Sequence, residues 1–381
     1  MIADLLQSAG HGRGNKPEPG IADWLESWHI DIWLLLLLLA VAIVGIFIQY
    51  SATDHSIEGV VSQAQRVVLG LIVMAAIAQA PPDMYRTVTP WLYGLTLLLL
   101  VATLLLGDAA KGATRWLDFG VIRFQPSEMM KLAMPATIAA FLHTRRLPPN
   151  VLTIIATLAL IGVPVVLIAK QPDLGTALLI VAAGGFALFL GGLRWRWIIG
   201  AFALAGAAAP LLWSHMQDYQ RQRILTLLNP ESDPLGAGYH ITQSMIAIGS
   251  GGVFGKGWLH GTQAKLDFLP EAHTDFIFAV YSEEMGFIGV MVLLVLYLAI
   301  VGRCLWIAAR AQDTFQRLLA GALAMTFFVY VFINIGMVIG LLPVVGVPLP
   351  LVSYGGTSAV SLLACFGMLM SIHTHRKLLA N

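Results

Sequence analysis

Long apolar runs restrict the fold of this chain more than any other feature of its sequence. A helix needs about 20 predominantly apolar residues to cross the hydrocarbon core of a bilayer, and the sequence contains ten such runs. They lie near residues 30–50, 65–80, 90–106, 126–143, 151–169, 175–193, 198–213, 276–302, 317–341 and 357–373. Hydrophobic residues fill 58% of the 381 positions and charged residues only 11%, a balance that a soluble domain of this length would not show. The sequence therefore predicts an all-α, polytopic membrane protein with about ten transmembrane helices.

The domain organisation follows from the position of the first run. Residues 1–29 are polar and lack the basic stretch, apolar core and small-residue cleavage site of a signal peptide, so we expect no cleaved leader. We predict that residues 1–29 form a cytoplasmic N-terminal segment and that residues 30–381 form a single transmembrane domain. Both cysteines, Cys304 and Cys365, belong to apolar runs and are expected to be structural.

The loops between the runs differ in length and charge. Short basic loops at residues 143–150 and 192–197 share one side with the C-terminal tail, and the positive-inside tendency assigns that side, with both termini, to the cytoplasm. The extracytoplasmic side then receives two longer loops, 107–125 and about 214–274. A loop of about 60 residues inside a compact domain is usually functional or disordered, and this one is not disordered in composition.

The larger outer loop contains two recognisable patterns. Ile241, Met245 and Ile248 fall on one helical face, which predicts a short amphipathic or re-entrant helix. The glycine-rich stretch at residues 249–258 contains Gly255-Lys256, which resembles the end of a phosphate-binding loop, but it has serine at the first glycine position and glycine at the hydroxyl position. We therefore expect no nucleotide.

Metal signatures are weak in this sequence. The large loop has four histidines without the spacing of a zinc site: His215, His240, His260 and His273. We expect neither zinc nor haem. A divalent cation such as Mg²⁺ or Mn²⁺ stays compatible with the sequence, because it needs only one or two protein oxygens beside a pyrophosphate.

A pair of opposite charges marks the fourth run. Pro126 and Ser127 indicate a helix start, which places Glu128 and Lys131 at positions i and i+3 on one face. A charge within a span costs about 2.5 to 3.5 kcal/mol on insertion scales, so the pair should face the bundle interior. It is either a salt bridge that orients the helix or a cation and carboxylate in the wall of an outward-facing cavity, and both can hold.

Cationic and aromatic side chains gather in the outer loops. Arg115 and Trp116 precede the charged helix, and Arg221 and Arg223 lie in the larger loop. Arginine suits bidentate phosphate contacts, so the cluster indicates an anionic ligand, although a solvated or headgroup-facing surface explains any single residue equally well. Trp116 fits either an interfacial belt or an aromatic platform under a sugar ring.

Asp275 stands where the larger loop enters the eighth run. Thr274 or Asp275 can cap the helix start, since an acid there accepts hydrogen bonds from free amides. The same position puts a carboxylate beside basic outer loops, where it can act as a general base or hold a metal ion. Glu283 and Glu284 lie about two turns deeper and need partners.

Several stretches also match a known family in order along the chain. The longest is "NIGMVIGLLPVVGVPLPLVSYGGTSA" at residues 334–359. Others are "KGATRWLDFG", "QPSEMMK", "QPDLGTA", "DPLGAGYHITQS", "GKGWLHGTQ" and "FLPEAHTDFIFAV". Together they resemble the SEDS family (shape, elongation, division and sporulation) of bacterial cell-wall polymerases, over most of the chain from residue 30 onward. The resemblance is nearest to the branch that determines rod shape.

The resemblance implies a multi-pass protein of the bacterial inner membrane that polymerises lipid II outside the cytoplasm. It implies an inverting, metal-assisted glycosyltransferase that works with elongation-complex membrane proteins and a class B penicillin-binding transpeptidase of the PBP2 type, and not with nucleic acid. The family's essential aspartate corresponds to Asp275, its charged pair to Glu128 and Lys131, and its loop tryptophan to Trp116, while Asp173 also falls in a family motif.

The chemistry of this reaction suits the outer charges. The acceptor hydroxyl needs one base, and undecaprenyl pyrophosphate leaves as a stabilised anion that cationic side chains can bind. The candidate cations are Lys111, Arg115, Arg221, Arg223 and Lys265. Two alternatives remain open, a transporter that flips lipid II and a non-catalytic scaffold for the transpeptidase.

Overall fold

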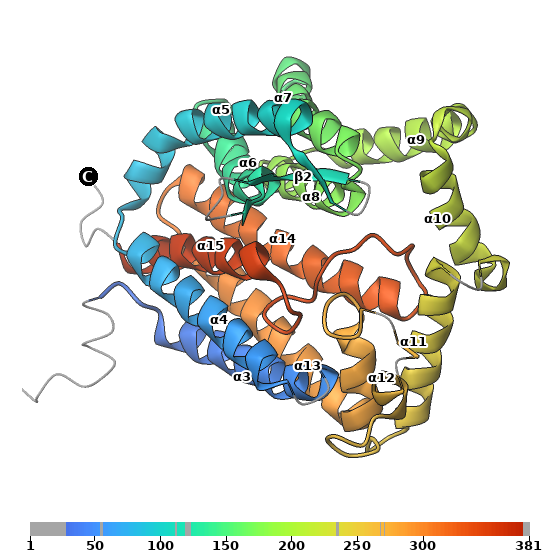
Figure 1. Cartoon of the computed structure of the whole chain (residues 1–381). Coiled ribbons are helices and arrows are strands. Elements are labelled where there is room, and N and C mark those ends of the chain that lie inside the picture. Colours follow the sequence, from blue (N-terminus) through green and yellow to red (C-terminus); the bar gives the residue numbers. More distant parts are fainter. Residues whose placement is uncertain are drawn as a thin grey trace, which may run out of the picture.

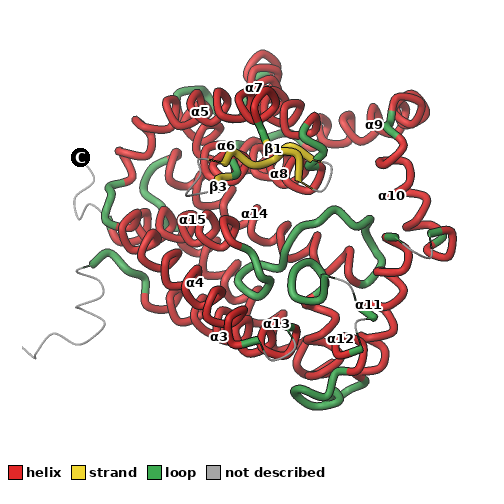
Figure 2. Tube along the Cα trace, viewed as in Figure 1, coloured by secondary structure: helices red, strands yellow, loops and turns green. Residues whose placement is uncertain are grey.

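The protein is a bundle of long helices that carries one small sheet (Figures 1 and 2). The computed structural model describes residues 28–53, 56–110, 113–118, 123–233, 236–266, 268–269 and 271–375. Its helices are α3 (Ile32–Ala52), α4 (Ile57–Ala78), α5 (Pro82–Leu106), α6 (Pro126–His143), α7 (Val151–Lys170), α8 (Leu174–Leu190), α9 (Trp195–His215), α10 (Asp218–Leu228), α11 (Ala237–Gly251), α12 (Thr262–Lys265), α13 (Ile277–Ala309), α14 (Thr314–Val338) and α15 (Gly356–Thr374), with a 3₁₀ turn η1 (Pro230–Ser232).

Each of the ten apolar runs coincides with a long helix, so the predicted fold class is confirmed. Within the described residues, seven helices are long and apolar enough by themselves to cross a membrane: α3, α4, α5, α7, α13, α14 and α15. The rings of His29 and His375 stack with their centroids 3.7 Å apart, so the two described ends of the chain lie at the same end of the bundle.

Two predicted boundaries were wrong at their N-terminal ends. The runs near 65–80 and 90–106 belong to α4 and α5, which begin at Ile57 and Pro82. Pro82 occupies the first turn of α5, where its missing N–H costs nothing, and Ser56 caps α4 by accepting a hydrogen bond from the Gly59 amide at 3.2 Å. Helix starts with polar residues are not visible in a scan for apolar runs.

Helix α14 forms the centre of the bundle. It packs against α6, α8, α13 and α15. In its most apolar stretch of 18 residues, 72% of the residues are buried, compared with 22% in the peripheral α4. Helices α4 and α15 pack closely on one side, and α5, α6, α7 and α8 form a layer on the other. The interior between these layers is where Lys131 of α6 and Asp173, the cap of α8, lie near Tyr330 of α14.

The connection between α14 and α15 is irregular, and side chains from the bundle satisfy its backbone. Non-helical backbone at membrane depth is tolerated only where protein buries it or where it lines a cavity. Asn334 Nδ2 donates to the Val347 carbonyl at 2.7 Å, and Tyr297 Oη donates to the Pro350 carbonyl at 2.7 Å. The loop is thus a fixed part of the core.

The loop 107–125 contains the sheet, which the sequence did not predict. Its strands β1 (Asp108–Ala110), β2 (Ala113–Asp118) and β3 (Arg123–Phe124) pair antiparallel in the order β1-β2-β3. Trp116 pairs with Asp108, and Leu117 pairs with Phe124. Such short strands depend on each other and on the helices beneath them, so they give no clear pattern of their own.

The larger outer loop forms α10, α11 and α12, which confirms the short helix expected there. Its buried face differs slightly from the expected one. Ile241, Ser244 and Ala247 are buried against the bundle, whereas Met245 is 49% exposed. Ser244 Oγ donates to the Val338 carbonyl at 2.7 Å, which ties α11 to the end of α14.

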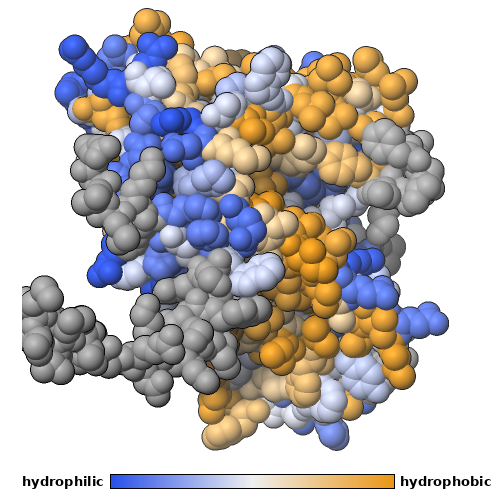
Figure 3. All heavy atoms as spheres, turned by 90° about the vertical axis from the view of Figure 1, so that its left-hand side faces the viewer, coloured by the Kyte–Doolittle hydropathy of each residue, from blue (hydrophilic) through white to orange (hydrophobic). Residues whose placement is uncertain are grey.

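The end of the bundle near the described chain ends is shown in Figure 3. Hydrophilic side chains gather there beside an apolar surface. The acid Asp31 caps α3 and binds Arg303 from α13, with Nη2 and Oδ2 2.6 Å apart. This end is therefore polar, as expected of a face in contact with water.

Candidate active site

A polar cavity of about 250 Å³ lies where β2, α6, α8, α14 and the 346–358 segment meet. Five residues singled out in the sequence line it: Arg115, Trp116, Glu128, Lys131 and Asp173. They come from three separate stretches of the chain, and the fold brings them to one wall. A concave site with a few convergent polar groups is the usual form of a small-molecule site.

Glu128 and Lys131 form a buried ion pair in the cavity wall. Lys131 Nζ lies 2.6 Å from Glu128 Oε1, and the two side chains are 8% and 7% exposed. Ser361 of α15 donates to Glu128 Oε2 at 2.6 Å, and Lys131 also donates to the hydroxyl of Tyr330 on α14. The pair therefore joins three helices and also presents charge to the cavity, so both interpretations of the pair are compatible with its geometry.

Asp173 begins α8 at the same wall. Its Oδ1 accepts a hydrogen bond from the Thr176 amide at 3.2 Å, which caps the helix, and its Oδ2 accepts one from Gln125 Nε2 at 3.2 Å. Gln125 is the residue before α6 begins at Pro126. The aspartate thus fixes the starts of two helices relative to each other.

Arg115 and Trp116 enter the cavity from β2. Arg115 donates through Nη2 to the Pro172 carbonyl, next to Asp173. Its Nε is buried and has no hydrogen-bond partner among the described residues. A buried cationic N–H without a partner is costly, so this guanidinium has capacity for an anion.

Asp275 lies beside the cavity. A β-carbon on Gly346, which lines the cavity with φ at +72°, would lie 3.5 Å from Asp275 Oδ2. Asn334 Nδ2 donates to the Asp275 carbonyl at 3.0 Å. These contacts fix the aspartate backbone at the edge of the charged wall.

The expectation that Thr274 or Asp275 caps the eighth long helix was wrong. Helix α13 begins at Ile277, the cap position is Phe276, and no side chain makes a capping hydrogen bond there. Thr274 Oγ1 donates instead to Glu271 Oε2 at 2.8 Å. Six residues of turn precede the helix, which displaces the acid from the position that the sequence indicated.

The two predicted arginines of the larger outer loop do not line the cavity. Arg221 and Arg223 belong to α10, which packs against η1 and α11. Arg221 donates to the Trp213 and Ser214 carbonyls at 3.0 and 2.8 Å, so it ties α10 to the end of α9.

Of the two predicted lysines of the outer loops, one lies within the described residues. Lys265 ends the short helix α12, is exposed and does not line the cavity. Lys111 lies outside the described residues.

Some cavity residues were missed by the sequence reading. Tyr330 and Tyr354 line the cavity, and Ser361 bonds the wall carboxylate. Tyr330 and Asn334 are four residues apart in an otherwise apolar helix, a spacing that puts both on one face. This polar pair was a signal that could have identified the face of α14 toward the site.

The described residues contain no cluster of three or more His, Cys, Asp or Glu side chains that could hold a metal ion. Both oxygens of Glu128 and both of Asp173 already accept hydrogen bonds. A cation such as Mg²⁺, which needs only one or two protein oxygens beside a phosphate, does not require such a cluster.

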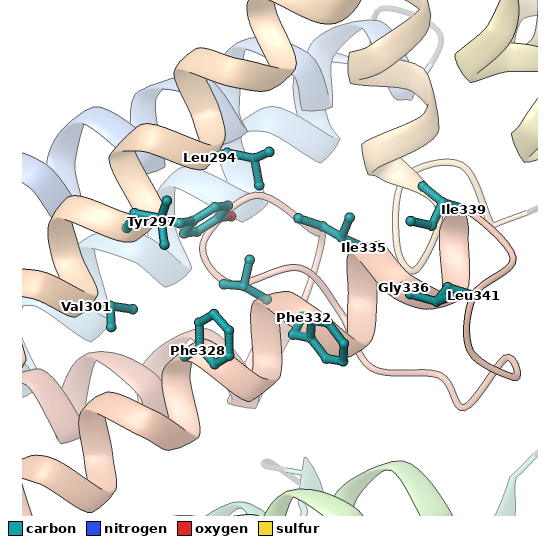
Figure 4. A pocket seen from close by; sticks show the side chains of 11 residues that line it. Leu294, Tyr297, Val301, Phe328, Phe332, Ile335, Gly336, Ile339 and Leu341 are labelled. Carbon is teal, nitrogen blue, oxygen red and sulfur yellow. The ribbon is translucent and has the colours of Figure 1, made fainter.

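A second hollow of different character lies between α13 and α14. It encloses about 190 Å³, and Figure 4 shows apolar side chains of both helices turned toward it, including Val301, Phe328 and Phe332. The hydroxyl of Tyr297 is engaged with the Pro350 carbonyl. This groove has no charged group for chemistry.

The fold and the cavity define a class of protein: a multi-pass membrane protein with a charged cavity at one end of its helix bundle. A family model described as cell cycle protein, of the FtsW, RodA and SpoVE type, matches residues 26–378. The chain belongs to this family, which confirms the resemblance to SEDS proteins.

Curated relatives agree with the family assignment. The chain is 54% identical over 363 residues to the peptidoglycan glycosyltransferase MrdB of Escherichia coli K12, covering 95% of this chain and 98% of that protein. It is 38% identical over 361 residues to a probable peptidoglycan glycosyltransferase FtsW of Geobacter sulfurreducens, covering 91% of this chain and 96% of that protein. The higher identity to MrdB supports the rod-shape branch.

Solved structures share the fold. A chain in a peptidoglycan synthase complex, in a study of how polymerization and crosslinking are coordinated, superposes with a TM-score of 0.80 at 30% identity, covering 91% of this chain and 99% of that one. The rod shape determining protein RodA of Thermus thermophilus superposes with a TM-score of 0.69 at 29% identity, covering 91% of this chain and 98% of that one. The predominantly helical architecture is therefore that of the family.

Proposed function

We propose that this chain is a peptidoglycan glycosyltransferase that polymerises lipid II into glycan strands during cell elongation and rod-shape maintenance. It lies in the bacterial inner membrane with both termini in the cytoplasm and the cavity at the extracytoplasmic end. The observation that carries the proposal is the single polar cavity wall on which Arg115, Glu128 and Lys131 meet, with Asp275 at its edge. The names of the relatives agree with this activity.

Asp275 is the general base in this proposal. The acceptor's 4-hydroxyl must lose its proton as it attacks the anomeric carbon of the donor, with inversion at that carbon. Asp275 Oδ2 lies at the cavity edge, 3.5 Å from where a β-carbon on Gly346 would lie, so it can meet an acceptor hydroxyl bound in the cavity. Its backbone contact with Asn334 holds it at the cavity edge.

Arg115 binds the leaving pyrophosphate. Lys131 already donates to Glu128 and Tyr330, whereas Arg115 retains a buried Nε–H without a partner. Undecaprenyl pyrophosphate departs as a stabilised anion, and a guanidinium can take two of its oxygens in a bidentate contact. No paired acid is required, because the leaving group needs no proton.

Trp116 supplies an apolar face for a sugar ring. It lines the cavity beside Arg115 and is fixed by strand pairing with β1. A divalent cation, Mg²⁺ or Mn²⁺, would be held by Asp275 and the substrate phosphates, and it would neutralise the charge of the pyrophosphate. The loop cations Lys111, Arg221, Arg223 and Lys265 remain candidates for attracting lipid II from the membrane surface.

A flippase is the second candidate, because α13 is broken at Gly286, where φ is +64°. Discontinuous helices are common at transporter sites. Vesicles that contain the purified protein and labelled lipid II separate the two activities. We expect glycan strands and undecaprenyl pyrophosphate, in amounts reduced by a chelator if the cation takes part. Lipid II that changes leaflet without forming strands would contradict the proposal.

The chain works with a class B penicillin-binding transpeptidase of the PBP2 type and with other elongation proteins in this proposal. The solved relative in a peptidoglycan synthase complex supports such an assembly. A scaffold without activity would bind the transpeptidase but would form no strands. Polymerisation by the purified chain, with and without that partner, distinguishes a polymerase from a scaffold.

A further inference from the structure

Helix α13 is two helices joined at a break. Gly286 has φ +64° and ψ −167°, so the helical backbone stops there and restarts. The first piece runs from Ile277 to the break and is about 13 Å long at 1.5 Å per residue. Asp275 precedes this piece directly, so its position depends on where the piece is held.

The glycine-rich segment of the outer loop completes the backbone at the break. The amides of Lys256 and Gly257 donate to the carbonyls of Glu283 and Glu284, each at 3.0 Å. A β-carbon at Gly255, where φ is +79°, would lie 2.1 Å from the Glu284 carbonyl oxygen. The glycines that failed to form a nucleotide site thus allow this loop to approach the broken helix.

The second helical piece is joined to the same segment. Its first amides, at Phe287 and Ile288, donate to the carbonyls of Gly252 and Val253 at 2.9 and 3.1 Å. Carbonyls at the end of one piece and amides at the start of the next would otherwise be unsatisfied. The loop therefore stabilises the break from both directions.

Glu283 fastens the loop to the first helical piece through its side chain. This side chain is 0% exposed, and its Oε1 lies 2.6 Å from Lys256 Nζ. The same oxygen accepts hydrogen bonds from the Thr262 amide at 2.8 Å and from Thr262 Oγ1 at 2.9 Å. Charge-assisted hydrogen bonds of this kind are roughly twice as strong as neutral ones.

Glu284 extends the attachment to α3. Its carboxylate accepts a hydrogen bond from the hydroxyl of Ser51. At the other end of the piece, Asn334 of α14 holds the Asp275 carbonyl at 3.0 Å. The short helix is thus fixed at both ends, by α14 near the cavity and by the loop and α3 at the break.

We propose that Lys256 and Glu283 are positioning residues for the carboxylate of Asp275. This inference rests on the proposed function. The ion pair holds the short helix against the loop. Because the position of the helix is fixed, the position of Asp275 at its other end is fixed as well. Neither residue lines the cavity, so their contribution is to the placement of the base and not to substrate contact.

The test compares Lys256→Met with Lys256→Arg in lipid II polymerisation. Lys256 is 28% exposed, so its replacement opens no cavity in the core, but it leaves the buried Glu283 without its ion partner, and kcat is therefore measured on protein shown to be folded by thermal unfolding. We expect Lys256→Met to lower kcat by about 10- to 100-fold with KM for lipid II nearly unchanged, since small misplacements of a catalytic group have effects of this size. Lys256→Arg retains the charge and restores most of kcat. His260→Gln, an exposed change in the same loop, is the control and keeps the wild-type rate.

Two further measurements exclude other roles of the lysine. In a Glu283→Gln background, we expect Lys256→Met to have little additional effect on kcat, because the ion pair is already broken. Amide exchange at Lys256 and Gly257 becomes faster in Lys256→Met, because these amides bond the short helix. A rise in KM with unchanged kcat would show direct substrate binding by Lys256 and overturn the positioning role.

The outcomes for the two proposals are distinct. Strands formed by the wild type and by Lys256→Met at equal kcat would overturn the positioning role and leave the polymerase in place. Absence of strands from the wild type would overturn both.

Discussion

Two buried ion pairs occupy opposite ends of this molecule and have different surroundings. At one end, Asp31 binds Arg303 at 2.6 Å, its Oδ1 caps the Leu34 amide at 2.9 Å, and His373 Nδ1 lies 3.0 Å from Oδ2. At the other end, Glu128 and Lys131 are equally close but form the wall of a cavity. Burial of a charge pair therefore does not by itself indicate a functional site, whereas a buried pair that also lines a cavity does.

The Asp31 pair has the properties of a structural link. Although burial opposes ionisation, hydrogen bonds from His373 and Arg303 lower the pKa of Asp31 to about 2. The carboxylate therefore remains charged at every physiological pH. It connects α3, α13 and α15 where both described chain ends meet.

The largest expected effect is on activity when the cavity pair is changed. Lys131→Met or Glu128→Gln alone leaves a buried charge without its partner, which costs about 3 to 5 kcal/mol of stability. We expect polymerisation to fall by about 100-fold as well, through loss of preorganised charge. Thermal unfolding and strand synthesis measure the two effects separately.

The double variant Glu128→Gln/Lys131→Met distinguishes the two roles of the pair. It should regain much of the stability, because no unpaired charge remains, and should stay inactive. Recovery of both stability and activity would show that the cavity pair has only a structural role, like the Asp31 pair.

The second-largest expected effect is a loss of stability without a loss of activity. Asp31→Asn keeps a good capping residue but removes the charge, and we expect a loss of about 3 kcal/mol. The kcat of the folded protein should stay within about twofold of wild type, because distant sites act independently. A large fall in kcat in fully folded Asp31→Asn protein would show that the two ends are coupled.

The pH dependence of this loss has a defined sign. A carboxylate with a lowered pKa contributes stability above its unfolded pKa of about 4, and this stability is lost as pH falls through about 2. The difference in unfolding free energy between wild type and Asp31→Asn should shrink as pH falls below about 4. Acid titration of both proteins measures it.

A smaller effect concerns helix caps at the two ends. Asp173→Ala removes the cap of α8 at the cavity, and Asn150→Ala removes the cap of α7, where Asn150 Oδ1 accepts from the Thr153 amide at 2.8 Å. Each should cost about 1 kcal/mol. Only Asp173→Ala should also lower polymerisation, because Asp173 lines the cavity. Equal activity losses would indicate a general effect of destabilisation.

The smallest effect is expected in the apolar groove. Phe332→Ala removes a side chain that is 48% exposed, so stability should change by less than about 0.5 kcal/mol and the strand-forming rate should be unchanged. Phe327→Ala on the same helix removes a side chain that is 2% exposed and should cost about 3 to 5 kcal/mol. A strong loss of polymerisation in Phe332→Ala would bring the groove into the catalytic mechanism.

The sequence predicted the elements whose signals are local. Apolar runs identified the long helices, and the spacing of Glu128 and Lys131 identified their common face. Arg115, Trp116 and Asp173 were candidates from separate stretches, and the fold placed them on the same wall. Membrane helices follow from composition, because each one satisfies its own backbone.

Features that depend on distant contacts were not predictable in this way. The cap at Asp275 failed because the turn before α13 extends to Phe276. The break at Gly286 lies inside an apolar run. It is stabilised by backbone hydrogen bonds to residues 252–257, about thirty residues earlier in the chain. Charge alone could not separate Arg115, which lines the cavity, from Arg221, which ties α9 to α10.

The most direct measurement of the central claim is lipid II polymerisation by Asp275→Asn and Glu271→Gln. Both changes remove one carboxylate charge from the same turn, but Glu271 is exposed and bonds Thr274. We expect Asp275→Asn to lose at least about 100-fold in strand synthesis, as removal of a general base does, and Glu271→Gln to retain the wild-type rate. Strand synthesis by folded Asp275→Asn at the wild-type rate would contradict the assignment of Asp275 as the base.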